Sequence, residues 1–265
     1  MTTITANLQA VRERIERAAQ AAGRRASDIE LIAVSKTFPA QDIAEAWEAG
    51  QRAFGENYVQ EAVEKVTQLS HLPLEWRVEP AHQNNDHARS DAPRPSAGVA
   101  SPEGPLLRPL EWHFIGPIQS NKTRAIAEHF QWVHSIERVK IAQRLNDARP
   151  AHLPPLNVCI QVNVSGEGSK SGVAPGAELA LARAMLALPR LRLHGLMAIP
   201  EPTPDMQLQR RRFALLRNIK DRLTADGIAL DTLSMGMSDD LEAAIAEGAT
   251  MVRVGTAIFG KRKKT

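Results

Sequence analysis

Short apolar runs alternate with amphipathic segments along most of this chain. The first run, residues 29–35 (IELIAVS), is rich in Ile, Leu and Val, and a run of this length bounded by polar residues is typical of a buried strand. Residues 39–50 follow it, with apolar residues at helical spacing and a glycine at the end that is typical of a helix stop. The same order of strand and helix then repeats along the chain.

Eight strands are predicted in this way, and a clear helix follows seven of them. Strict alternation of this kind favours a parallel sheet covered by helices, and so many units in 265 residues favour a closed (β/α)8 barrel of the TIM type over an open sheet. No GxGxxG motif follows the first strand, which argues against a dinucleotide-binding fold. The predicted strands are residues 29–35, 52–55, 111–116, 132–136, 155–164, 191–200, 231–236 and 250–260.

Two helix features add detail to this α/β fold. The first 20 residues predict an extra amino-terminal helix, because Leu8, Val11, Ile15 and Ala18 recur at three- and four-residue spacing. Further along, Ser120 is expected to cap the helix over residues 120–130, because a serine side chain can accept a bond from an unpaired N–H of the first turn.

One segment breaks the alternation before the third strand. Residues 77–108 are rich in Pro, Ala, Ser and Gly and show no usable apolar period, so they are predicted to be disordered or a long loop. The tetrapeptide PLEW occurs on both sides, at residues 73–76 and 109–112, and only the second copy leads into a strand. We interpret the segment as an insertion within a single domain that spans residues 1–265, and its composition indicates no function of its own.

Composition and charge exclude several functional classes. The net charge of +3 is close to balanced, much of the excess lies in the tail KRKKT, and aromatic residues make up only 4%, so a nucleic-acid surface is not expected. No apolar stretch is long enough to cross a membrane. The single cysteine, Cys159, lies in an apolar run and is expected to be a core residue, and no histidine pattern indicates a metal site. We therefore expect a cytoplasmic protein without a structural metal.

Two basic residues are placed where a barrel carries its chemistry, at the carboxyl ends of strands. Lys36 ends the first apolar run, although burying an ammonium group is costly. Arg253 lies within the last strand and shares its face with Gly255, so an inward glycine implies an inward arginine that needs an acceptor. A surface lysine that extends its ammonium into water is the alternative for Lys36.

The two last strands end in turns of small residues, MGMSDD at 235–240 and VGTA at 254–257. Backbone N–H groups in such turns attract an anion, and the hydroxyls of Ser238 and Thr256 add donors. Taken singly, Ser238 is a natural helix cap and Gly255 relieves crowding. Together with the lysine and the arginine, the turns suit a phosphorylated aldehyde, with the lysine forming an imine. Pyridoxal 5′-phosphate has an aldehyde for the lysine, a phosphate for the turns and a ring for the arginine to face.

The chain resembles the pyridoxal phosphate homeostasis proteins, which share the barrel of the amino-terminal domain of alanine racemase. The resemblance runs from about residue 8 to residue 261 apart from the insertion, and it is carried by AVSKTFPA, FGENYVQE, WHFIGPIQSNK, HGLMAIP, LSMGMSDDLEAAIAEG and MVRVGTAIFG. It implies that Lys36 holds the cofactor as a Schiff base and that Arg253 lies by the pyridine nitrogen. It also implies a phosphate site at Ser238, Gly255 and Thr256, with Asn57 and Met197 lining the ring pocket.

Arg253 bears on whether such a protein is an enzyme. An arginine does not give up its proton in proteins, so the pyridine nitrogen would stay unprotonated and the ring would stabilise a carbanion weakly. Racemases with such an arginine use a second base, a tyrosine from a separate domain of a partner subunit. The sequence ends shortly after the last strand, so we expect no such domain, and its single tyrosine is Tyr58.

We therefore expect a monomeric carrier without strong catalytic activity, which holds pyridoxal phosphate for vitamin B6 and amino-acid homeostasis and passes it to apoenzymes. A slow racemase or lyase acting on amino acids is the alternative. A regulatory protein that uses the cofactor only as a sensor input is a third interpretation.

Overall fold

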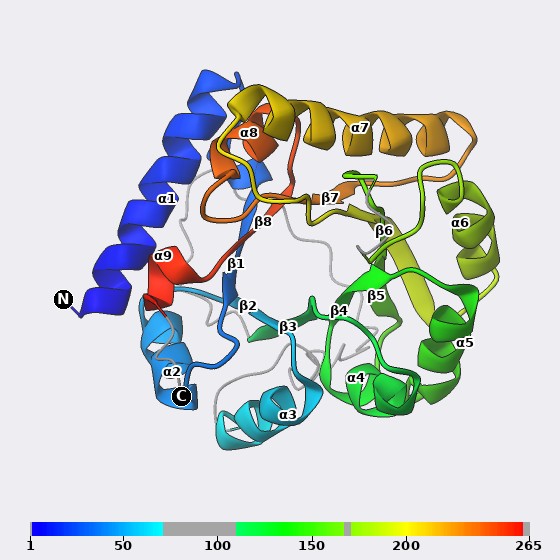
Figure 1. Ribbon diagram of the computed structural model, residues 1–265. Helices are drawn as coiled ribbons and strands as arrows, with labels where there is room; N and C mark the ends of the chain where they lie inside the picture. Colours follow the sequence, from blue (N-terminus) through cyan, green and yellow to red (C-terminus); the bar gives the residue numbers. More distant parts are fainter. Residues whose placement is uncertain (1, 71–109, 167–170, 262–265) are drawn as a thin grey trace, which may run out of the picture.

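Eight parallel strands close into a barrel in the order of the sequence, β1 to β8 (Figure 1), in a computed structural model that describes residues 2–70, 110–166 and 171–261. Closure is made by β8 pairing with β1, with Arg253 level with Ile32. The predicted (β/α)8 barrel is therefore confirmed. The strands are β1 (Glu30–Val34), β2 (Ala53–Glu56), β3 (Glu111–Phe114), β4 (Trp132–Ile136), β5 (Leu156–Gln161), β6 (Leu191–Met197), β7 (Thr232–Ser234) and β8 (Met251–Val254).

Helices surround the barrel and cover its outer face (Figure 1). The predicted amino-terminal helix is present as α1, capped by the Thr2 hydroxyl, which accepts the N–H of Thr5 at 3.3 Å. The helices are α1 (Thr3–Ala21), α2 (Ala40–Glu48), α3 (Val59–Gln68), α4 (Thr123–His129), α5 (Val139–Ala148), α6 (Glu178–Leu186), α7 (Met206–Ala225), α8 (Leu241–Ala246) and α9 (Thr256–Phe259), with the short 3-10 turns η1 (Ala26–Asp28) and η3 (Ser120–Lys122).

Two predicted boundaries are wrong. Ser120 does not cap a helix: it begins η3, and α4 starts only at Thr123, whose hydroxyl donates to the Ser120 carbonyl at 3.0 Å. The predicted strand over residues 250–260 also divides in two, because the chain leaves the extended conformation at Gly255 and continues as the four-residue helix α9.

Two separate apolar cores result from strands that are buried on both faces. The larger core lies between the strands and the helices and includes the buried face of α1. The smaller one fills the interior of the barrel and includes Cys159, which is fully buried as expected, and its burial raises the pKa of the thiol. The residues of the inner core are Ile32, Ala53, Trp132, Cys159, Met197 and Met251.

The predicted insertion, residues 77–108, lies outside the described residues. Within the described part of the chain, no helix combines the length and the apolar character that a membrane span requires.

Candidate functional site

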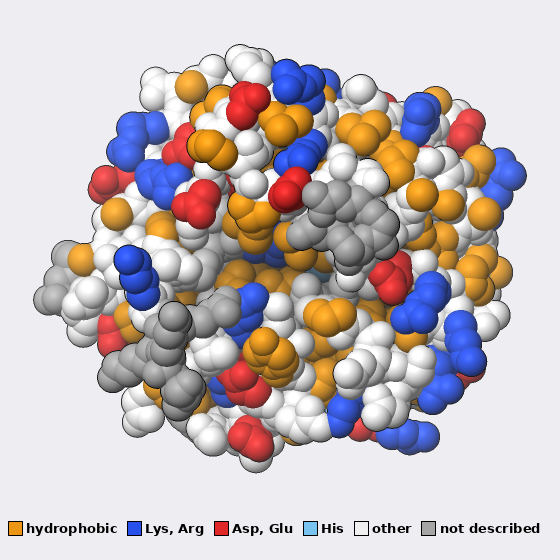
Figure 2. Space-filling model, viewed as in Figure 1, with side chains coloured by type: hydrophobic (Ala, Val, Ile, Leu, Met, Phe, Trp, Pro, Cys, Tyr) orange, Lys and Arg blue, Asp and Glu red, His pale blue; other side chains and the backbone are white. Residues whose placement is uncertain are grey.

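A cavity of about 210 Å³ opens at the carboxyl ends of the strands. The face in Figure 2 is hollowed near its middle, over the barrel strands, and hydrophobic and basic side chains border the hollow. Its walls come from the loops after β1, β2, β3, β6, β7 and β8, so they bring together segments that are far apart in the sequence. The lining residues are Val34, Lys36, Phe38, Asn57, Ile115, Ile199, Met237, Ser238, Asp239, Arg253, Gly255 and Thr256.

Six of the seven residues that the sequence predicted for a cofactor line this cavity; Met197 is the exception. Met197 is fully buried in the inner core, level with Gln161 and Ser234 on the neighbouring strands. Ile199, two residues further on, lines the cavity instead. In extended chain these two positions share a face, so Met197 lies one layer deeper than predicted.

The turn after β1 presents Lys36 to the cavity. Lys36 is half-buried, and the next residue, Thr37, has a φ of 69°, the only positive φ outside glycine among the described residues. A β-branched residue rarely adopts this conformation, because its side chain clashes with the backbone there. Such strain persists only where neighbouring groups hold it, and here Glu61 accepts the N–H of Thr37 at 2.5 Å.

A buried ammonium group supports the same turn from below. Lys65, on α3, donates to the Ser35 carbonyl at 2.8 Å, to Glu56 at 2.7 Å and to Glu61 at 2.5 Å. The Ser35 hydroxyl also donates to Glu56 at 2.7 Å, and burial raises the pKa of this carboxyl. Sequence reasoning missed this network, because three charged residues on or beside an amphipathic helix are normally solvated.

Arg253 lies at the floor of the cavity and is buried, as its position on the strand predicted. Its guanidinium donates to the Ser234 hydroxyl at 2.6 Å and to the Ala198 carbonyl at 2.8 Å. Burial lowers the pKa of Arg253 to about 10, so the group remains a cation at neutral pH. The acceptors that the sequence argument required are therefore neutral oxygens on β7 and after β6.

From Arg253 a chain of hydrogen bonds runs down through the barrel. Ser234 contacts Nδ1 of His134 at 2.8 Å, and Nε2 of His134 contacts Nδ1 of His113 at 3.0 Å. Burial lowers the pKa of His113 to about 3 and that of His134 well below its usual value, so both rings are neutral. We name this set, Arg253, Ser234, His134 and His113, the interior polar chain.

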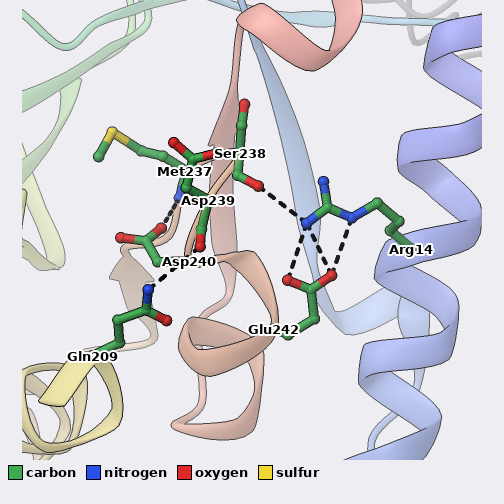
Figure 3. A network of polar contacts seen from close by, with 7 residues as sticks. All are labelled: Arg14, Gln209, Met237, Ser238, Asp239, Asp240 and Glu242. Atoms are coloured by element: carbon green, nitrogen blue, oxygen red, sulfur yellow. Dashed lines mark hydrogen bonds and ion pairs between the residues drawn. The ribbon is translucent and has the colours of Figure 1, made fainter. Parts of the chain in front are cut away.

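The turn after β7 is fixed from both sides (Figure 3). Asp240 accepts the N–H of Met237 at 2.5 Å, while Arg14 on α1 donates to the Ser238 carbonyl at 3.0 Å. Arg14 also grips Glu242 through both carboxylate oxygens at 2.9 and 3.0 Å. The Ser238 carbonyl is thus drawn outward toward α1, and the residue's other side faces the cavity.

Glycines shape the backbone around these turns. Gly236 has a φ of 95°, and a Cβ there would lie 2.6 Å from that of Ala244. A Cβ at Gly255 would come within 3.1 Å of the Val34 carbonyl, so relief of crowding, the alternative that the sequence left open, explains this glycine. A Cβ at Gly116 would lie 2.4 Å from the Asn57 carbonyl, so this glycine lets the Asn57 backbone pack closely.

Asn57 brings an unpaired polar atom to the cavity. Its Oδ1 atom is buried and makes no hydrogen bond, although the residue lines the cavity. Buried polar atoms are normally paired, so an unpaired amide oxygen at a cavity wall indicates a donor supplied from outside the chain.

Comparison of the chain with known proteins identifies its family. The family model of the alanine racemase N-terminal domain matches residues 6–263. The pyridoxal phosphate homeostasis protein of Pseudomonas aeruginosa is 55% identical over 262 residues, covering 99% of this chain and 97% of that protein. The protein of the same name from Escherichia coli K12 is 49% identical over 266 residues, covering 99% and 98%.

Solved structures agree with the sequence relatives. PipY of Synechococcus elongatus with PLP bound has a TM-score of 0.73 and 32% identity, and the match covers 97% of this chain and 100% of that one. Alanine racemase of Corynebacterium glutamicum shares the fold at a TM-score of 0.61 and 15% identity, and the match covers 99% of this chain and 61% of that one. The chain belongs to the family of the pyridoxal phosphate homeostasis proteins, built on the fold of the alanine racemase N-terminal domain.

Proposed function

We propose that this chain binds pyridoxal 5′-phosphate in the carboxyl-end cavity and holds it in reserve for intracellular vitamin B6 and amino-acid homeostasis. The observation that carries the proposal is the convergence of Lys36, Arg253 and two turns with anion-binding character in one cavity. A relative that this chain matches over nearly its whole length has PLP bound.

The residues present fit this ligand. The unpaired amide oxygen of Asn57 offers an acceptor at the wall. The Ser238 and Thr256 hydroxyls offer donors to a phosphate, together with the first N–H groups of α9, which have no partner within a helix. The cationic groups of Lys36 and Arg253 favour an anionic ligand electrostatically.

Each group then has a distinct task. Bound pyridoxal phosphate supplies an aldehyde that condenses with amines and a ring that withdraws electrons. Lys36 would supply the amine that condenses with the aldehyde carbon. Arg253 would supply a hydrogen-bond donor to the ring nitrogen, and because a guanidinium keeps its own proton it would leave that nitrogen unprotonated. The strained turn at Thr37 holds the Lys36 side chain toward the cavity.

A carrier role is favoured over racemisation by the position of Tyr58. It is the single tyrosine of the sequence, its side chain is 54% exposed, and it is not among the residues that line the cavity. The cavity therefore has no tyrosine of its own chain in its lining to act as a second base. Transfer of the held cofactor to apoenzymes completes the proposal.

Borohydride reduction tests the covalent link. The purified chain is loaded with pyridoxal phosphate, reduced and digested, and the labelled peptide is identified by mass spectrometry. We expect one label on the peptide containing Lys36 and none in Lys36→Ala. The matched control is Lys140→Ala, which removes an exposed lysine on α5 and should label like the wild type. Label on another lysine in the wild-type chain would contradict the proposal.

Two further measurements separate the carrier from the slow enzyme. The loaded chain is mixed with an apo-transaminase, and the rate at which transaminase activity recovers is measured. Recovery that is faster than the rate expected from cofactor that first dissociates into solution supports direct delivery. Exchange of the α-hydrogen of amino acids with deuterated water reports catalysis. Fast exchange that disappears in Lys36→Ala would favour the racemase or lyase instead.

A further inference from the structure

The amino-terminal end of the barrel gathers two carboxylates and an imidazole. Glu30 begins β1, Glu111 begins β3, and His113 lies two residues further along β3. One ligand atom of each lies within 4.8 Å of the others, with the glutamates half-buried and the histidine buried. Sequence spacing does not reveal this cluster, because its residues come from β1 and β3. These two strands lie near each other only because β2 pairs with both.

A second observation points to a ligand at this place. Nε2 of His113 is buried and has no hydrogen-bond partner, and it lies 3.9 Å from Oε2 of Glu111. Burying a polar atom unpaired is costly, and most buried ring nitrogens are satisfied. Both glutamates have polar partners of their own, so the unpaired nitrogen of His113 is the atom that indicates a ligand.

The neighbours of the cluster orient it in the way that metal ligands are usually oriented. The other ring nitrogen of His113, Nδ1, is hydrogen-bonded to His134 at 3.0 Å. The indole N–H of Trp132 donates to Oε1 of Glu111 at 2.5 Å and leaves Oε2 turned toward the histidine. Second partners of this kind fix the tautomer of a ligating histidine and the orientation of a ligating carboxylate.

We propose that Glu30, Glu111 and His113 bind a divalent transition-metal ion of the Zn²⁺ type at the amino-terminal end of the barrel. One imidazole nitrogen and two carboxylate oxygens are a donor set that such ions take, with water completing the coordination. Ligand atoms around Zn²⁺ lie about 3.3 Å apart, so the carboxylates approach the ring slightly when the ion binds. The site lies at the opposite end of the barrel from the cavity, and the inference does not depend on the proposed cofactor.

Metal binding would also determine which atom donates and which accepts in each hydrogen bond of the interior polar chain. An ion on Nε2 of His113 leaves the ring proton on Nδ1, which must then donate to His134. His134 in turn donates from its own Nδ1 to the Ser234 hydroxyl, which also accepts from Arg253. An ion at the site thus selects one of the two possible directions of hydrogen-bond donation along the interior polar chain, which reaches the floor of the cavity.

Isothermal titration of the full-length chain with Zn²⁺ tests the site. We expect one high-affinity ion per chain, and weaker binding of Mg²⁺, which prefers an all-oxygen octahedral site. The double variant Glu30→Gln/Glu111→Gln should weaken Zn²⁺ binding by at least about 100-fold, because losing even an outer partner of a metal ligand costs about 10- to 100-fold. The matched control is Glu48→Gln/Glu64→Gln, which removes the same charge from exposed positions on α2 and α3 and should bind as the wild type does.

Nitrogen NMR of the wild-type chain supplies a measurement that needs no variant. On addition of Zn²⁺ we expect the Nε2 resonance of His113 to move to the position of a metal-bound nitrogen, while exposed His152 serves as the internal reference. Absence of a high-affinity ion, equal affinity in the double glutamine variant, or an unmoved His113 resonance at saturating Zn²⁺ would each overturn the proposal.

Discussion

The two ends of the barrel are built differently. At the carboxyl end many of the groups that line the cavity lie in loops, and two of these loops are held by charged residues of the surrounding helices: Lys65 and Glu61 under the turn at Thr37, and Arg14 behind Ser238. At the amino end the polar groups of the cluster lie on the strands themselves. A loop can carry a strained conformation only when side chains hold it, so we expect the carboxyl end to be the more sensitive to removal of charges around it.

The largest effect is expected when the charge of Lys65 is removed. Lys65→Met leaves Glu56 buried without its cation, and breaking a buried ion pair in this way costs about 3–5 kcal/mol of unfolding free energy. The turn at Thr37 also loses its support, so pyridoxal phosphate binding should weaken in protein that remains folded. Urea unfolding followed by circular dichroism measures the first effect, and an absorbance titration with the cofactor measures the second.

Lys140→Met serves as the control, because it makes the same lysine-to-methionine substitution at an exposed position on α5. Adding Glu56→Gln to Lys65→Met should restore part of the lost stability, since the uncompensated carboxylate is then absent. A loss below about 1 kcal/mol in the single variant, the range of surface pairs, would show that the network does not hold the turn.

Acid is expected to act next most strongly, through the interior polar chain between the two ends. The folded-state pKa values of His113 and His134 lie below those of the unfolded chain, so below about pH 6 the unfolded state binds protons that the folded state refuses. Stability should therefore fall as the pH falls, by up to about 1.4 kcal/mol per pH unit for each ring. The raised pKa values of Glu56 and Asp240, both caused by burial, act in the opposite direction.

Unfolding free energies measured between about pH 6 and pH 4 isolate the histidine contribution when His113→Asn is compared with the wild type. The slope should be smaller in this variant and unchanged in His152→Asn, which removes an exposed histidine. Equal slopes in all three proteins would mean that the buried rings do not resist protonation.

Sequence patterns predicted the strands and the inward direction of Arg253, because both follow from alternation along a strand. They did not predict depth along the barrel axis. Met197 and Ile199 share a face, and only the closed barrel places the first in the inner core and the second at the cavity. Their cofactor contacts, and those of the other predicted residues, stay predictions.

The supporting residues escaped sequence reasoning for a different physical reason. Lys65 lies on an amphipathic helix, where a lysine is normally solvated, and its burial depends on a turn from another part of the chain. The interior polar chain joins the neighbouring strands β3 and β4 to the neighbouring strands β7 and β8, and its link from His134 to Ser234 forms only when the closed barrel brings β4 opposite β7. Local periodicity contains no information about either contact.

A smaller effect is expected from glycine replacement at the turn after β7. Gly236→Ala places a Cβ 2.6 Å from Ala244 in a backbone with positive φ, and we expect a loss of about 1–3 kcal/mol. Gly227→Ala is the control, since its φ is also positive but no atom lies within 4 Å of the added Cβ. Thermal unfolding of both variants separates crowding from backbone strain, and equal losses would mean that Ala244 yields without cost.

The smallest change in stability is expected for Arg14→Ala. This variant also tests directly whether a charged residue outside the sheet holds the turn after β7. Its pairing with Glu242 is partly exposed, so we expect a loss of stability of at most about 1 kcal/mol. The Ser238 carbonyl nevertheless loses the donor that draws it toward α1, so the affinity for pyridoxal phosphate should fall several-fold. Arg17→Ala removes a more exposed arginine from the same helix and should leave the affinity unchanged. If both variants bind the cofactor as the wild type does, the turn after β7 keeps its shape without Arg14, and of the two turns only the one at Thr37, which Lys65 and Glu61 hold, depends on outside charges.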